Sequence, residues 1–498
     1  MIDAAVARRS SFSWSGYLTV MAVGLFLAAT AVRAGPKPFA VAVAILLATM
    51  LAWLVRPFIG LSLTLLFSLI GDIVTSAWWP FTKSMSSRES IMFVTTSLNI
   101  SPLDLAVLVG FAALFGRYLI SGSWPFRGGP LLRPLLAFTA FILVGLAYGI
   151  AKGGSTRIAL IEVRPILYLP LMYVLVVSVC RTIVDFRRLL WVAIVAIVIH
   201  ALLSLRYFGT LTAAEMALKE GIMEHTAALR MNLLFVVVVV VWLFPGTPKS
   251  ARWLTTCAAV PVIVVYFQSG RRAAIVGLGA ALVLAALTLY WRHSQKFWRL
   301  VPVAFIIVTG YTGAFWHSTS GAGFPAQALK SVVAPGSVNA RDQSSDLYRT
   351  VENFDLHYTI RSSKVLGTGF GQVFYRPLPL PDISSYQFYL YVPHNSVLWI
   401  WINAGFGGFV ALLYLLARTL MIGASRIRRA ADGSNLLVVL VGTTFVVMFA
   451  VFAYVDISWD VHNMVLLGYA LAACACAPLC EEPVAATAPF DQRVLSDV

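Results

Sequence analysis

The feature that most constrains this chain is a long series of apolar segments, each close to the length that a lipid bilayer requires. A transmembrane helix needs roughly 17–25 mostly apolar residues. Candidate spans lie at residues 17–32, 39–55, 58–75, 102–116, 134–151, 165–180, 188–205, 229–244, 253–268, 273–290, 300–315, 394–417, 436–455 and 461–477. Several are short enough to be re-entrant or tilted, so we predict about 12–14 transmembrane helices.

The composition excludes a soluble enzyme. Of the 498 residues, 59% are hydrophobic and only 12% are charged, whereas a soluble protein carries about 25% charged residues. So few charged groups cannot cover the surface of a globule of this size, but they suit a chain that lipid surrounds. Because helices satisfy their own backbone groups in hydrocarbon, we predict an all-α polytopic membrane protein.

The net charge of +16 would suggest a nucleic-acid partner in a soluble protein. In a membrane protein, basic residues are instead expected in cytoplasmic loops, so no nucleic acid is predicted. Four basic clusters fall on one predicted side: Arg117/Arg127/Arg133, Arg181/Arg187/Arg188, Arg292/Lys296/Arg299 and Arg418/Arg426/Arg428/Arg429. That side, with both termini, is predicted to be cytoplasmic.

The predicted domain organisation follows from the one long polar segment, residues 316–393, on the opposite side of the membrane. Loops of this length are usually functional or disordered. We predict a helical bundle over residues 1–315, a large extracytoplasmic loop domain over 316–393, three final helices over 394–477, and a disordered cytoplasmic tail over 478–498. Within the loop, residues 346–363 predict a helix.

A short outer hairpin, Ser269-Gly270-Arg271-Arg272, joins two apolar spans. Two guanidinium groups at the membrane surface are costly unless they meet phosphate or carboxylate. They are candidates to bind a phosphate group. The alternative is that they extend to lipid headgroups or pair with a structural acid.

A second candidate is His394, which with Asn395 begins the predicted span 394–417 after a proline. The unpaired N–H groups of a helix N-terminus can bind a diphosphate. Their field also disfavours imidazolium, so we expect His394 to be neutral and able to accept a proton. The alternative is a structural hydrogen-bonding histidine.

The outer loop contains two further candidates. Gly367, Gly369 and Gly371 form a run whose backbone N–H groups could approach an anion, or which could simply make a tight turn. Upstream, Arg349 shares a predicted helix face with Glu352 and Asn353; an Arg349–Glu352 ion pair is the alternative to ligand binding.

Two weaker candidates lie at other outer helix ends. Arg164 and Glu162 could contact a lipid phosphate, but we expect them to pair with each other. His462-Asn463 repeats the His-Asn dipeptide after Asp460, and a structural cap is expected there rather than a second base.

Taken together, these motifs resemble the bacterial O-antigen ligase and O-antigen polymerase family. The resemblance rests on His394-Asn395-x-x-Leu398, on the following Gly405 and Gly408, on the glycine run, on the outer hairpin and on the large late loop. It covers about residues 250–420. Family members usually have Ser-Arg-Gly at the hairpin, so either Arg271 or Arg272 could be the important arginine.

The resemblance implies a metal-independent, inverting glycosyltransferase that needs no cofactor. Such enzymes take a glycan from undecaprenyl diphosphate at the periplasmic side of the bacterial inner membrane and transfer it to a hydroxyl of lipid A core, a polysaccharide or a protein. His394 would act as the base, Asn395 would hold the ring or the sugar, and Arg349 with Arg271 or Arg272 would clamp the diphosphate. No Asp-x-Asp pair indicates a metal on the outer side. Ligase or polymerase, and the oligomeric state, stay open.

A transporter or flippase of lipid-linked oligosaccharide is the alternative function. Transporters usually carry ionisable or broken helices at the membrane midplane. The predicted spans have few charges at their centres and the unusual residues gather at the outer rim, which favours transfer chemistry.

Overall fold

The computed structural model describes residues 39–96, 99–218, 223–318, 321–381 and 388–479, and within these ranges it is helical without strands. The predicted span 17–32 and residues 480–498 of the predicted tail lie outside the described residues. The first half contains α2 (Phe39–Val55), α3 (Pro57–Ile70), α4 (Pro102–Ser121), α5 (Leu132–Ala151), α6 (Thr156–Val179), α7 (Ile183–Phe208), α8 (Ala213–Leu218) and α9 (Ala227–Leu243). The second half contains α10 (Lys249–Gln268), α11 (Arg272–Arg292), α12 (Ser294–Ala314), α13 (Phe324–Val333), α14 (Ala340–Ser362), α15 (Ser396–Arg429), α16 (Ser434–Val455) and α17 (Val461–Cys476).

The described part of the chain has nine helices long and apolar enough to cross a membrane, namely α4 to α7, α10 to α12, α15 and α16. The apolar helices α2, α3, α9 and α17 are shorter. The described part of the chain is therefore all-helical and consistent with the predicted polytopic membrane protein. The total of 12–14 transmembrane helices stays a prediction.

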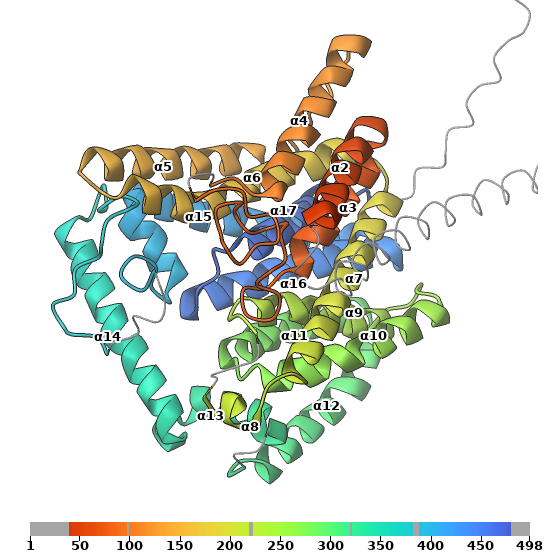
Figure 1. The fold of residues 1–498 in the computed structure, drawn as a ribbon. Coiled ribbons are helices and arrows are strands. Elements are labelled where there is room, and N and C mark those ends of the chain that lie inside the picture. The colour runs from red at the N-terminus through yellow and green to blue at the C-terminus, as the bar shows by residue number, and fades with distance from the viewer. Residues whose placement is uncertain (1–38, 97–98, 219–222, 319–320, 382–387, 480–498) are drawn as a thin grey trace, which may run out of the picture.

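Two helices of membrane-spanning length, α16 and α12, occupy different places in the bundle. Helix α16 is apolar all round and mostly buried, and with α17 it lies at the centre of the molecule (Figure 1). Helix α12 is also apolar, yet none of its residues is buried. A helix whose apolar surface is mostly left uncovered by protein faces lipid in a membrane protein, so α12 lies at the rim.

Two prolines show how the sequence sets helix boundaries. Pro57 separates α2 from α3, because Arg56 before it is extended (φ −138°, ψ 92°). Pro165, in contrast, lies inside α6, which begins at Thr156 after the capping residue Ser155. The prediction that a span begins at residue 165 was therefore wrong.

The predicted gathering of basic loops at one end of the bundle is confirmed. Arg292 donates to the carbonyl of Ile427 (Nη1 to O, 2.7 Å), which joins the ends of α11 and α15. Arg187 donates to Ser434 (Nη1 to Oγ, 2.6 Å), which joins the starts of α7 and α16. The sequence alone assigns this end to the cytoplasm, and that assignment stays a prediction.

The last long helix, α15, contains a break at Gly405 (φ 69°, ψ −177°). A side chain there would place its Cβ 2.4 Å from the carbonyl oxygen of Val365. The Phe406 amide donates to that carbonyl (2.9 Å), and the Thr368 amide donates to the carbonyl of Ile402 (2.6 Å). The outer loop thus supplies the backbone hydrogen bonds that the broken helix lacks.

The long polar segment is largely helical where it is described. Its main element, α14, begins at Ala340, six residues before the predicted start, because Asn339 accepts the amide of Asp342 as an N-terminal cap. Near its C-terminal end, Leu356 packs in a small core with residues of α15. This packing sets α14 against the start of α15. The limits of the predicted loop domain, 316–393, stay a prediction.

Candidate functional site

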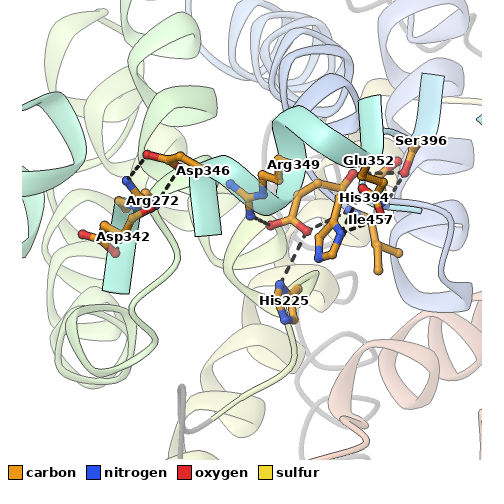
Figure 2. Close-up of polar contacts among 11 residues, drawn as sticks. His225, Arg272, Asp342, Asp346, Arg349, Glu352, His394, Ser396 and Ile457 are labelled. Carbon is orange, nitrogen blue, oxygen red and sulfur yellow. Dashed lines mark hydrogen bonds and ion pairs between the residues drawn. The ribbon is translucent and has the colours of Figure 1, made fainter. Parts of the chain in front are cut away.

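Two consecutive residues of α14 hold the two residues before α15; Figure 2 shows the first pair, Glu352 and His394. The Glu352 carboxylate accepts the backbone N–H of His394 (2.9 Å) and lies 3.1 Å from its ring Nδ1. The neighbouring Asn353 accepts a hydrogen bond from the side-chain amide of Asn395 (3.0 Å). Asn395 in turn accepts the amide of Leu398 (3.0 Å) and caps α15. Glu352 and Asn353 of α14 therefore position the two predicted residues, His394 and Asn395.

The expected electrostatics of His394 were wrong. Helix α15 begins at Ser396, so the histidine precedes the helix and its cap. Burial lowers the pKa of His394, but the hydrogen bond and charge of Glu352 outweigh it, and the pKa is raised above its ordinary value. A full negative charge 3.1 Å away is stronger than the partial charge of a helix terminus.

Asp456, directly after α16, lies between Arg349 and His225, which are both labelled in Figure 2. Its Oδ2 lies 3.4 Å from Nη2 of Arg349, and its Oδ1 lies 3.5 Å from Nδ1 of His225. Burial raises the pKa of the Asp456 carboxyl, but His225, Arg349 and His394 around it hold that pKa well below its usual range. The Arg349–Glu352 pair considered from the sequence does not form; Arg349 pairs with Asp456 instead.

The two arginines of the outer hairpin lie in different environments. Gly270 takes the left-handed conformation (φ 64°) that the tight turn requires. Arg272 pairs with two carboxylates of α14: its Nη2 lies 2.9 Å from Asp346, and its Nε lies 3.6 Å from Asp342. For Arg272 the structural alternative therefore holds.

Arg271, which precedes α11, lies on the side of His225 and Glu224. Burial and nearby carboxylates raise the pKa of Glu224 to about 8, and the charge of Arg271 acts against that increase. The same charge acts to lower the pKa of His225, in addition to burial. Arg271 therefore adds its charge to the side of the site where His225 meets Asp456.

The glycine run is a packed turn. Gly367, Gly369 and Gly371 all have positive φ values (72°, 89° and 79°). Their amides donate to protein acceptors: Gly367 to the carbonyl of Ser363 (3.0 Å), and Gly371 to the carboxylate of Glu162 (2.7 Å). The anion-binding interpretation of this loop was wrong, because helices α5, α6 and α15 approach too closely and supply the acceptors.

The two weaker sequence candidates are structural. Arg164 lies 2.8 Å from Asp104 (Nη2 to Oδ2) and does not pair with Glu162 as predicted. The reason is that residues two apart on a helix point in different directions. His462 contacts the carbonyl of Ser68, and Asp460 caps α17 by accepting an amide (2.6 Å).

Sequence reasoning did not assign site roles to Glu352, His225 and Asp456. Each reaches the site from a different element, and Glu352 is separated from His394 by 42 residues. One sequence signal could have suggested the contact between Glu352 and His394: each of these residues is followed by an asparagine. No protein-family model and no curated protein matches this sequence.

Proposed function

We propose that this chain is an inverting glycosyltransferase of the bacterial inner membrane. It transfers a glycan from undecaprenyl diphosphate to an acceptor hydroxyl at the periplasmic side. The single observation that carries the proposal is the arrangement of His394 on the Glu352 carboxylate beside Arg349, which Asp456 holds in place. A displacement of this kind needs a group that accepts the hydroxyl proton and cations for the departing diphosphate.

His394 is the base in this proposal. Glu352 accepts the Nδ1–H of the ring, which leaves Nε2 as the proton acceptor. Carboxylate–histidine pairs orient imidazole in this way in many enzymes. The edge of the Tyr348 ring packs against the imidazole, with 5.5 Å between ring centroids, and the His394 side chain keeps 19% of its surface exposed. The ring is thus held but accessible.

Arg349 is the first candidate to bind the diphosphate. Its Nη2 faces Asp456, while its Nε is buried and has no hydrogen-bond partner among the described residues. The side chain is 25% exposed. Arg271 is the second candidate. Arg272 is not a candidate, because Asp342 and Asp346 already neutralise it.

The reaction can be written with these groups alone. The acceptor oxygen forms a bond to the anomeric carbon from the face opposite the diphosphate, and its proton passes to Nε2 of His394. The bond from the anomeric carbon to the phosphate oxygen breaks, and undecaprenyl diphosphate leaves with the electron pair. Guanidinium groups stabilise the charge that develops there. The acceptor is lipid A core in a ligase or a glycan chain in a polymerase.

A transporter of lipid-linked oligosaccharide is the second candidate function, and the break of α15 at Gly405 favours it. Broken helices often form substrate sites in transporters. Here, however, residues 365–368 occupy the break and satisfy its backbone groups. Transfer is the better proposal for that reason.

The deciding experiment uses the purified full-length protein in liposomes with a glycan on undecaprenyl diphosphate and an acceptor. We expect transfer product and free undecaprenyl diphosphate with the wild type, and neither with His394→Ala. His357→Ala is the matched control, because His357 is exposed on α14. Full activity of His394→Ala would reject the proposal. Movement of the donor between leaflets without product would indicate the transporter.

A further inference from the structure

A pocket of about 550 Å³ lies between the start of α3 and the ends of α4 and α6. It is far from His394. Ser68, near the other end of α3, contacts His462 at the start of α17, whereas Ser178 at the end of α6 lines the pocket. Since α17 begins beside Asp456, the pocket lies at the opposite end of the bundle, where the basic loops gather.

The pocket is positively charged. Arg117 and Arg181 line it, and none of its lining residues is acidic. The guanidinium of Arg181 has no hydrogen bond or ion pair among the described residues. Burial and the like charge of Arg127 lower the pKa of Arg181. The carboxylate of Asp185 accepts the backbone amide of Arg181 (3.0 Å) and takes part in the capping box that begins α7. An anion in the pocket would relieve this concentration of positive charge.

The polar groups of the pocket suit phosphate oxygens. The hydroxyls of Ser121 and Ser123 line it and lie 2.9 Å apart, and Ser178 adds a third hydroxyl. Arg117 is held in position because its Nη2 donates to the carbonyl of Val55 at the end of α2 (3.0 Å). Guanidinium and hydroxyl donors are common ligands of phosphate groups.

The mouth of the pocket is apolar. Ile120 and Trp124 line the pocket, and their exposed fractions are 89% and 64%. Leu119 beside them is 69% exposed, and α4 projects from the rest of the bundle (Figure 1). Tryptophan is typical of the membrane–water interface. A ligand with a charged head and apolar chains fits this surface better than a free anion does.

We propose that this pocket binds the phosphodiester headgroup of an anionic phospholipid, between Arg117 and Arg181, with the acyl chains along the exposed face of α4. Basic pockets between membrane helices bind anionic headgroups in other proteins by the same chemistry. The site is separate from the proposed glycan transfer and does not depend on it.

The test is retention of lipid by the purified full-length protein, measured by native mass spectrometry after exchange into phosphatidylglycerol or phosphatidylcholine. We expect phosphatidylglycerol to be retained and phosphatidylcholine to be lost. The double variant Arg117→Gln/Arg181→Gln should bind phosphatidylglycerol about tenfold or more weakly. The control Arg133→Gln/Arg299→Gln removes two exposed arginines of the same end and should bind like the wild type.

Three results would overturn the proposal: equal retention in both double variants, equal retention of the two lipids by the wild type, or displacement of phosphatidylglycerol by inorganic phosphate. The last would mean that the pocket recognises a free anion. If the double variant does not fold, Ser123→Trp fills the pocket while keeping both arginines, and it should also release phosphatidylglycerol.

Discussion

Glu352 and His394 are joined twice, through the backbone N–H at 2.9 Å and the ring Nδ1 at 3.1 Å. One carboxylate therefore fixes both the position of the chain before α15 and the rotation of the imidazole. The ring cannot turn without losing one of these contacts. This double contact makes the proposed proton-accepting role of His394 testable through Glu352.

Glu352→Gln removes the charge that raises the pKa of His394. Below its pKa the imidazole is protonated and cannot accept a proton, so activity should appear as the pH rises through that pKa. Without the carboxylate the pKa falls, and the acidic limb of the rate–pH profile should move to lower pH. The maximal rate should fall by about 10²-fold, because the ring is less well oriented. An unshifted profile would contradict the role of Glu352, and Asp342→Asn on the same helix is the control.

Substitutions of the two hairpin arginines should have different effects on the transfer rate. Arg271→Ala should lower the transfer rate by about 10²–10³-fold if its charge stabilises the departing diphosphate. Arg272→Ala should leave the rate near that of the wild type and reduce stability by about 1 kcal/mol, because only its pairs with Asp342 and Asp346 are lost. Initial rates and thermal unfolding of both variants in the same detergent make the comparison. The reverse order of effects would refute our assignment.

Asp456→Asn should destabilise the protein. The change leaves Arg349 and His225 beside a neutral, buried amide. Removing the partner of a buried charge costs about 3–5 kcal/mol of stability. The pKa of Asp456 is depressed, so its contribution to stability is present above about pH 4, the unfolded value, and is lost as the pH falls toward the folded value. As the pH is lowered from about 5 to about 2, the unfolding temperature should therefore fall less steeply in the variant than in the wild type.

Gly405→Ala tests the break in α15. The new Cβ would lie 2.4 Å from the carbonyl oxygen of Val365, at a positive φ that alanine disfavours. We expect a loss of about 1–3 kcal/mol of stability. Gly279→Ala in α11 is the matched control, since nothing lies within 4 Å of the added carbon. Equal unfolding temperatures of the two variants would show that the break is not required.

The sequence predicted helices well because hydrophobic segment length and capping residues are local signals. It located α16 and α17 to within two residues, and the basic residues correctly placed several loops at one end. It failed where the answer depended on tertiary contacts. Nothing near Arg164 indicates that Asp104, 60 residues away, is its partner rather than Glu162.

In the candidate site, too, local signals could be found in the sequence but tertiary contacts could not. His394 and Asn395 could be selected from the sequence because they stand at a helix start, but Glu352 and Asp456 acquire their roles only when α14 and α16 meet at that start. The glycine run illustrates the opposite error. Its residues allow an anion to approach, and only the structure reveals that other chain segments already occupy their amides.

Helix α14 carries Asp346, Arg349 and Glu352 at intervals of three residues, so one rigid element bears the partners of Arg272, Asp456 and His394. A shift or rotation of α14 would move the Arg349 guanidinium and the Glu352 carboxylate together. In the proposed site, the contact that orients His394 and the position of the Arg349 guanidinium therefore cannot be changed separately by moving the backbone. They are assembled, or dismantled, in a single step.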